Sequence, residues 1–266
     1  MEHELIVFDL DDTLLNKEHK ISERTISAIK SLKAKGKKVT IATGRMFVSA
    51  LPYAEELEID LPVISYNGAY VCDPKSHKVI FHHAIPADLV QDIIREAEKE
   101  GLHLNLYYGD DFYIKERNEG VKIYEEIAGV KGKTIGKLSE NYRGEATKIL
   151  VIEKDQEKKH HYLDYFKENY GHKLEITESK EYFIEFTAKN VSKKEALENL
   201  AKSLDIPQKK VIAVGNGFND LTMIEWADLG IAVDNAPQAV KEKANIIAGH
   251  HDDNGVADIL EEIFDI

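Results

Sequence analysis

Residues 5–13 of the chain read Leu-Ile-Val-Phe-Asp-Leu-Asp-Asp-Thr, and this stretch decides how the remainder is interpreted. Its first four residues form an apolar run that is too short for a helix, and acidic residues follow at once. A run of this kind indicates a strand buried on both faces, as in a parallel sheet. The sequence therefore predicts a buried strand at residues 5–8 that ends in an acidic loop.

The segments after this loop alternate between helix and strand. Ser22 has the side chain of a helix N-cap and opens an amphipathic stretch that Gly36 closes. Residues 39–42 predict a second short strand, a helical stretch that Pro52 interrupts comes next, and residues 61–65 predict a third strand. This alternation is typical of right-handed crossovers in a parallel sheet, so the predicted fold class is α/β.

The pattern changes between residues 84 and 189. A helix that ends at Gly101 is followed by a strand with a period of two and by a turn at Gly109, which together indicate a small α+β domain. Further strands are predicted at residues 148–152, 174–176 and 182–186. Because the helix–strand alternation returns afterwards, we predict a core of residues 1–83 and 190–266 with an inserted α+β domain at 84–189.

Composition excludes several classes of protein. The 266 residues include 48 acidic and 35 basic side chains, a formal charge of −13 that argues against a nucleic-acid or anionic-membrane surface. No apolar run exceeds four residues, which excludes a membrane-spanning helix, and Cys72 is the single cysteine, which excludes an internal disulfide or a cysteine cluster. The first residues lack the pattern of a secretory signal, so we expect a soluble, cytoplasmic protein.

Polar residues gather where the predicted strands end. Asp9 and Asp11 follow the first strand, Thr43 follows the second, and the run Gly-Asn-Gly-Phe-Asn-Asp at 215–220 follows a strand at 211–214. Ligands of open parallel sheets bind outside the carboxyl ends of the strands. We therefore expect these side chains to surround one site.

A lysine at a helix start adds a positive charge to this set. Ser192 and Glu195 form the pattern of a capping box, which places Lys193 at the first position of a helix. A cation is mildly unfavourable there, so this placement favours an anion bound beside Lys193. A solvated first-turn lysine is the alternative, and Lys194 is the competing candidate.

Two carboxylates two residues apart suggest a particular chemistry. Asp9 and Asp11 repel each other unless a cation lies between them, and an oxygen-rich site of this kind suits Mg²⁺. One carboxylate can then act as an ionised nucleophile while the other carries a proton for the leaving group. The pattern is typical of phosphoryl transfer through an aspartyl phosphate.

The whole chain resembles the haloacid-dehalogenase-like phosphatases, and among them the large-capped Cof-like branch. Four motifs carry the resemblance, in order: Asp9–Thr13, Ala42–Arg45, Val191–Lys193 and Gly215–Asp220. The stretches at 65–69 (Ser-Tyr-Asn-Gly-Ala) and 254–257 (Asn-Gly-Val-Ala) also resemble this branch. The resemblance implies a Rossmann-like three-layer core, with the insert as a mobile cap that sets substrate specificity.

The resemblance also implies roles for individual residues. Asp9 would be the nucleophile and a Mg²⁺ ligand, and Asp11 would be the general acid and then the base, with its backbone carbonyl on the metal. The remaining implied roles are phosphoryl binding by Thr43 and Gly44, charge neutralisation by Lys193, phosphate contact by Asn219, metal ligation by Asn216 and a water-mediated metal role for Asp220. Arg45 could reach the substrate or pair with an acid on its own helix.

Two residues depart from the family pattern. Asn216 stands where the family usually has an aspartate, and a neutral amide oxygen should bind Mg²⁺ more weakly. Asp12 replaces a common glycine and adds a third carboxylate beside the site. We expect these two changes nearly to balance in charge, so that metal affinity survives.

The expected function is that of a Mg²⁺-dependent phosphatase of small phosphorylated metabolites, either sugar phosphates or phosphorylated cofactors, acting as a monomer or small homo-oligomer. A sugar phosphomutase could share the aspartyl phosphate, and a non-catalytic phospholigand sensor is the alternative that Asn216 raises. The glycines of 215–217 also suggest a dinucleotide site, but acids rather than a glycine loop follow the first strand.

Overall fold

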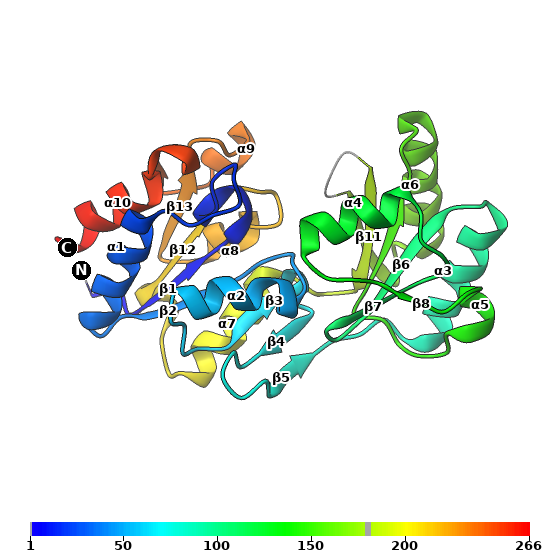
Figure 1. Ribbon diagram of the computed structural model, residues 1–266. Helices are drawn as coiled ribbons and strands as arrows, with labels where there is room; N and C mark the ends of the chain where they lie inside the picture. The colour runs from blue at the N-terminus through cyan, green and yellow to red at the C-terminus, as the bar shows by residue number, and fades with distance from the viewer. Residues whose placement is uncertain (1, 179–181) are drawn as a thin grey trace. The chain divides into compact units, whose positions relative to one another are not determined.

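The computed structural model describes residues 2–178 and 182–266, and the chain divides into two compact units (Figure 1). Unit 1 comprises Met1–Phe81 and Ser192–Ile266, and unit 2 comprises His82–Val191. The chain thus leaves unit 1 once and returns to it once. Among the described residues, no helix is both long enough and apolar enough to cross a bilayer.

Unit 1 is built on a five-stranded sheet in the order β14-β13-β12-β1-β2, in which every pairing is parallel. Its strands are β1 (Leu5–Phe8), β2 (Lys38–Ile41), β12 (Val211–Gly215), β13 (Leu229–Val233) and β14 (Ile246–Ala248). All four residues of β1 are fully buried, as the apolar run predicts for a strand that is covered on both faces. The predicted α/β fold class is confirmed.

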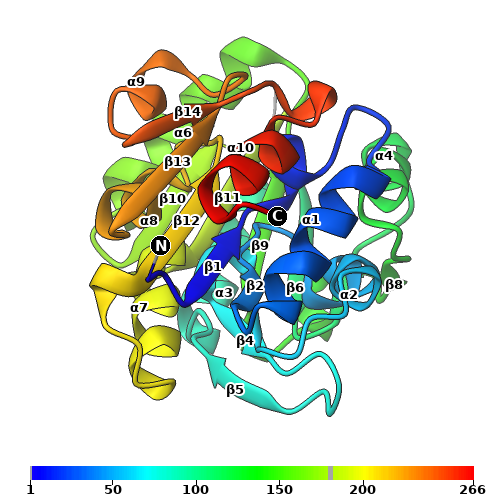
Figure 2. The same cartoon turned by 90° about the vertical axis from the view of Figure 1, so that its left-hand side faces the viewer.

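Helices cover both faces of this sheet (Figure 2). The helices α1 (Glu23–Ala34) and α10 (Gly255–Phe264) pack against each other on one side, and α7 (Lys193–Ser203) and α8 (Leu221–Trp226) on the other. The short helix α9 (Gln238–Lys241) precedes β14. The predicted N-cap of the first helix is confirmed, because Ser22 Oγ accepts a hydrogen bond from Thr25 N.

The helix after β2 differs from expectation. Residues Phe47–Glu56 form one helix, α2, with Pro52 in its interior, so the predicted interruption at this proline is wrong. Phe47, Ala50 and Ala54 on its inner face are fully buried. Packing of this face outweighs the one backbone hydrogen bond that a proline cannot donate.

The third predicted strand lies in a separate sheet. The strands β3 (Val63–Ser65), β4 (Tyr70–Cys72) and β5 (Val79–His82) form it in that order, and β3 pairs antiparallel with β4. A single parallel bridge between Ala42 and Ile64 connects it to the end of β2. The turn between β3 and β4 is thereby brought to the carboxyl end of the parallel sheet.

Unit 2 is an α+β domain around a six-stranded sheet in the order β10-β11-β9-β6-β7-β8. Its strands are β6 (His103–Tyr108), β7 (Asp111–Ile114), β8 (Lys133–Thr134), β9 (Lys148–Ile152), β10 (Leu174–Glu178) and β11 (Phe183–Ala188), and its helices are α3 (Ala87–Lys99), α4 (Glu119–Ala128), α5 (Leu138–Asn141) and α6 (Gln156–Tyr170). The apolar sides of α3 and α6 share a core with β6, β9 and β11. The predicted hairpin is formed by β6 and β7.

Candidate active site

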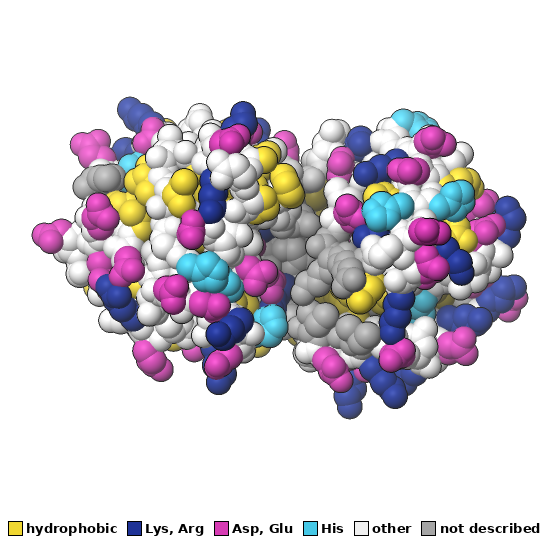
Figure 3. Space-filling model, turned by 90° about the horizontal axis from the view of Figure 1, so that it is seen from above, with side chains coloured by type: hydrophobic (Ala, Val, Ile, Leu, Met, Phe, Trp, Pro, Cys, Tyr) yellow, Lys and Arg dark blue, Asp and Glu magenta, His cyan; other side chains and the backbone are white. Residues whose placement is uncertain are grey.

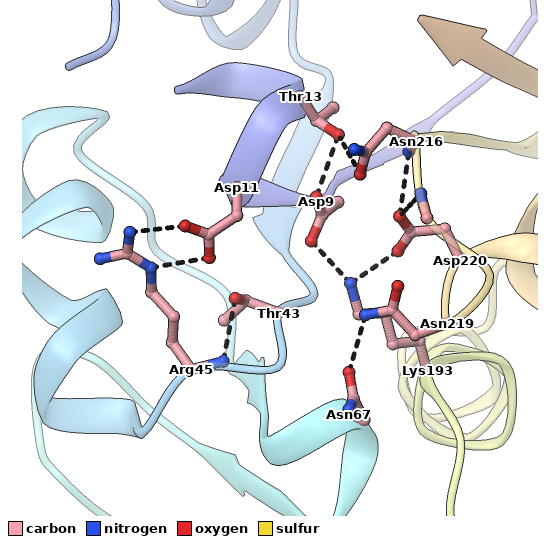
Figure 4. A network of polar contacts seen from close by, with 11 residues as sticks. Asp9, Asp11, Thr13, Thr43, Arg45, Asn67, Lys193, Asn216, Asn219 and Asp220 are labelled. Atoms are coloured by element: carbon pink, nitrogen blue, oxygen red, sulfur yellow. Dashed lines mark hydrogen bonds and ion pairs between the residues drawn. The ribbon is translucent and has the colours of Figure 1, made fainter. Parts of the chain in front are cut away.

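A buried lysine between two buried carboxylates lies at the carboxyl end of the parallel sheet (Figure 4). Lys193 Nζ donates to Asp9 Oδ1 and to Asp220 Oδ1, each at 2.6 Å. Lys193 and Asp220 are fully buried, and Asp9 is 4% exposed. Burial of three charges is costly unless they satisfy one another, so these residues form one interdependent cluster.

Local structure brings the three side chains together. Asp9 follows β1, and its backbone N donates to Val214 O of the neighbouring strand at 2.9 Å. Lys193 is the first residue of α7, and Ser192 Oγ caps that helix by accepting from Glu195 N. Lys194 points elsewhere, since it pairs with Glu198 of its own helix. Of the two candidate lysines, Lys193 is the one that reaches the aspartates.

The electrostatics of the cluster are unusual. Burial, reinforced by the charge of Asp220, raises the pKa of Asp9 to about 7, although Lys193 opposes this shift. Burial alone would lower the pKa of Lys193, but the carboxylates of Asp220 and Asp9 outweigh it and raise that pKa. Because the pKa of Asp9 is raised, any further positive charge beside it would favour its ionised form.

Asp220 organises the loop that carries Asn216. Its Oδ2 accepts hydrogen bonds from the backbone N of Asn216 at 3.0 Å and of Gly217 at 2.8 Å. A Cβ on Gly215 would lie 2.6 Å from the Asp220 side chain, so only glycine fits there. This loop places Asn216 Oδ1 3.3 Å from the Thr13 hydroxyl, which is also 3.0 Å from Asp9 Oδ2.

The second aspartate of the first loop faces away from this cluster. Arg45 makes a bidentate ion pair with Asp11, with Nε at 2.8 Å from Oδ2 and Nη2 at 2.6 Å from Oδ1 (Figure 4). The Arg45 guanidinium also lies over the Tyr53 ring, 5.1 Å from its centroid. An acid on its own helix, one of the two partners predicted for Arg45, is thus not its partner, because the folded chain brings the first loop alongside.

The remaining predicted residues border the same space. Thr43 is fully buried, and its Oγ1 accepts from Arg45 N at 3.1 Å, which stabilises the turn before α2. Asn219 Nδ2 donates to Asn67 Oδ1 at 3.0 Å, and a Cβ on Gly44 would lie 3.1 Å from that same oxygen. Sequence reasoning noted Asn67 only as part of a resembling stretch and gave it no role.

The donor groups at this site are those that suit a hard divalent cation. The Asp9 carboxylate and the Asn216 amide, whose oxygens lie 3.0 and 3.3 Å from the Thr13 hydroxyl, offer oxygen ligands, which match the preference of Mg²⁺. Asp220 is different, because its two oxygens already accept from Lys193 and from two backbone amides. The residues present therefore fit a metal, with Asp220 as the group that supports the loop.

Comparisons with known proteins agree with this geometry. The family model of haloacid dehalogenase-like hydrolases matches residues 6–260. The chain belongs to this family. It is 30% identical to the 5-amino-6-(5-phospho-D-ribitylamino)uracil phosphatase YitU of Bacillus subtilis, over 98% of both chains. Other similar curated proteins are also named phosphatases, so the predicted class of enzyme, a phosphatase of this family, is confirmed.

Solved structures show the same architecture over the whole chain. A haloacid dehalogenase-like hydrolase from Bacteroides thetaiotaomicron superposes with a TM-score of 0.91 at 27% identity, covering 98% of this chain and 100% of its own. The subclass IIB sugar phosphatase BT4131 gives a TM-score of 0.84 at 26% identity, with coverage of 99% and 100%. The resemblance to the Cof-like branch is thereby confirmed.

Proposed function

We propose that this phosphatase is Mg²⁺-dependent and hydrolyses small phosphorylated metabolites through an aspartyl phosphate on Asp9. The observation that carries the proposal is the buried Asp9 carboxylate, which Lys193 Nζ holds at 2.6 Å. This contact lies at the carboxyl end of the parallel sheet, which Thr43 and Asn219 also border. A carboxylate fixed by a cation in a dry site is a preorganised nucleophile, because it reacts without first shedding water.

The first half-reaction transfers the phosphoryl group to Asp9. A carboxylate oxygen of Asp9 forms a bond to phosphorus while the bond from phosphorus to the ester oxygen breaks. Asp11, which takes up a proton from water after it leaves Arg45, gives that proton to the ester oxygen. Lys193 offsets the charge on the phosphoryl oxygens. The Thr43 hydroxyl, whose oxygen accepts from Arg45 N, can donate its proton to one of them.

The second half-reaction releases inorganic phosphate. Asp11, now ionised, takes a proton from water as the water oxygen forms a bond to phosphorus, and the bond between phosphorus and Asp9 breaks. For either step Asp11 must leave the ion pair with Arg45, which holds it turned away from Asp9 (Figure 4). Arg45 is therefore proposed to hold Asp11 between turnovers, in addition to any contact with substrate.

A magnesium ion would be held by Asp9, Asn216 and the Asp11 carbonyl, with Asp220 acting through water. When bound, it supplies positive charge that keeps Asp9 ionised and attracts phosphate. Such local attraction matters because acidic and basic side chains are interspersed over the face seen in Figure 3 and the net charge is −13. An anionic substrate is thus drawn by the site and not by the protein's overall charge.

The substrate class is proposed from the relatives and from the chain's organisation. YitU is named for a phosphorylated ribityl compound and BT4131 for a sugar, so we propose a sugar phosphate or a phosphorylated cofactor. Unit 2 is proposed to select the leaving group. The cytoplasmic location and a monomeric or small oligomeric state stay predictions.

A panel of phosphorylated metabolites assayed with Mg²⁺ and with chelator tests this function. We expect phosphate release from at least one member with Mg²⁺, its loss with chelator, and its loss in Asp9→Asn. Binding without turnover would instead support a phospholigand sensor, and movement of phosphate within a sugar would support a phosphomutase. Failure on every member in both conditions would contradict the proposal.

A further inference from the structure

Three consecutive residues in the turn between β3 and β4 adopt left-handed backbone conformations. Tyr66, Asn67 and Gly68 have φ values of 51°, 55° and 106°. Side chains with a Cβ disfavour this region, a buried tyrosine especially, and Tyr66 is fully buried. Strained backbone of this kind persists only where surrounding contacts hold it, and it concentrates at functional sites.

The backbone of this turn holds two elements of the site. Tyr66 N donates to Arg45 O and Asn67 N donates to Thr43 O, each at 2.9 Å, which fixes the loop that carries Thr43. A Cβ on Gly68 would lie 2.3 Å from Ser192 O, so the turn packs directly against the start of α7. Lys193 is the next residue along that helix.

The side chain of Asn67 reaches a third element. Its Oδ1 accepts from Asn219 Nδ2 at 3.0 Å, and the two amides lie next to each other at the border of the site (Figure 4). An asparagine tolerates the left-handed conformation that this position requires and supplies a neutral acceptor. An aspartate would place another negative charge beside the phosphoryl group, and a glycine would supply no acceptor.

We propose that Asn67 is a positioning residue that orients the Asn219 amide, so that its second N–H is directed at the phosphoryl oxygens. The inference rests on the proposed function, because it assigns Asn219 a phosphoryl group to bind. The side chain of Asn67 acts through Asn219, whereas its backbone N holds the Thr43 loop whatever the side chain. Its contribution is therefore to affinity for the phosphoryl group rather than to folding.

The substitution Asn67→Gly separates the contribution of the Asn67 side chain from that of its backbone conformation. Glycine keeps the left-handed conformation at no steric cost and removes the acceptor. We expect kcat/KM, and the affinity for inorganic phosphate measured by calorimetry, each to fall about tenfold, the range for one lost hydrogen bond, with an unchanged Tm. The control is Asp205→Gly, an exposed residue with φ of 55° outside the site, which should change none of these.

A double-mutant cycle with Asn219→Ala tests the coupling itself. If Asn67 acts through Asn219, adding Asn67→Gly to Asn219→Ala should weaken phosphate binding no further. Additive losses, or a loss of Tm that parallels the loss of binding, would overturn the proposal. A wild-type protein that binds phosphate but hydrolyses no ester would overturn the proposed function. The inference about Asn67 would still be tested, because the double-mutant cycle can be measured on phosphate binding.

Discussion

Asp9 and Asp11 are two residues apart in the chain, yet their side chains have different surroundings. The Asp9 carboxylate is buried and bonded to Lys193 and Thr13, whereas the Asp11 side chain is 36% exposed and paired with Arg45. Asp9 therefore belongs to a cluster whose members cannot move independently. Asp11 sits in an ion pair that water can reach.

The difference matches what a nucleophile and a general acid require. A nucleophile benefits from a fixed, dehydrated position, because reorganisation during the reaction raises the barrier. A general acid that later serves as a base must exchange protons with substrate and water, so its side chain has to move. One short motif thus yields two electrostatic settings, because Asp9 directly follows β1 at the buried carboxyl end of the sheet, whereas Asp11 lies in the turn Leu10–Leu14 beyond it.

The largest expected effect is in the buried cluster. Lys193→Met would leave Asp9 and Asp220 buried without a cation, so we expect the free energy of unfolding to fall by about 3–5 kcal/mol and turnover by about 10³-fold. The control is Lys194→Met, which breaks a pair on a helix surface and should cost less than about 1 kcal/mol with turnover retained. Denaturant titration and phosphate release measure both. Equal effects in the two variants would remove the distinction between these lysines.

Substitution at the other aspartate should separate activity from stability. Asp11→Asn removes the proton donor, so turnover should fall about 10²- to 10⁴-fold, while the loss of a partly exposed ion pair changes the free energy of unfolding by less than about 1 kcal/mol. Asp12→Asn is the matched control at the next position and should leave turnover at saturating Mg²⁺ nearly unchanged. A large loss of stability in Asp11→Asn would contradict the contrast with Asp9.

A smaller effect is expected on Mg²⁺ affinity when Asn216, beside the buried Asp9, is replaced. Asn216→Asp replaces a neutral amide oxygen with a carboxylate near Asp9, so the Mg²⁺ concentration that gives half-maximal activity should fall about tenfold. Titration of activity with Mg²⁺ measures this shift. An unchanged Mg²⁺ dependence would show that residue 216 is not a ligand.

The smallest effect on Mg²⁺ affinity is expected when the exposed residue Asp12 is replaced. Asp12 has a left-handed backbone, with φ of 56°, which suits the glycine that is common there in the family. Asp12→Gly removes an exposed carboxylate near the site, so the half-maximal Mg²⁺ concentration should rise about twofold. The double variant with Asn216→Asp should lie between the single variants. A fall in the half-maximal concentration for Asp12→Gly would contradict the expected balance of charges.

The parallel core could be predicted because its strands are buried on both faces and are therefore continuous apolar runs. The strands β4 and β5 and the helix α4 could not. The two strands lie outside the parallel sheet, so the helix–strand alternation does not mark them, and α4 contains Gly120 in its first turn. Pro52 predicts a break in a helix that is in fact continuous, because tertiary packing of α2 outweighs the local preference of proline.

The site was predictable where a charged residue stands at a strand end or a helix start, as Asp9 and Lys193 do, because such positions indicate a binding or catalytic role. The pairing of Asp11 with Arg45 was not, because it joins loops 34 residues apart whose approach only the folded chain defines. Asn67 was missed for a related reason. Glycine usually signals a left-handed backbone conformation, and Tyr66 and Asn67 are not glycines. Their backbone strain is therefore visible only in the structure.

The most direct test of the central claim is to look for the phosphoryl group on Asp9 itself. The protein is mixed with a hydrolysed substrate and Mg²⁺, quenched in acid during turnover, and mapped by peptide mass spectrometry. We predict one added phosphoryl group on the peptide that contains Asp9, more of it in Asp11→Asn, and none in Asp9→Asn. Phosphate release from the wild-type protein with Asp9 unmodified, or with the phosphoryl group on another residue, would contradict the account.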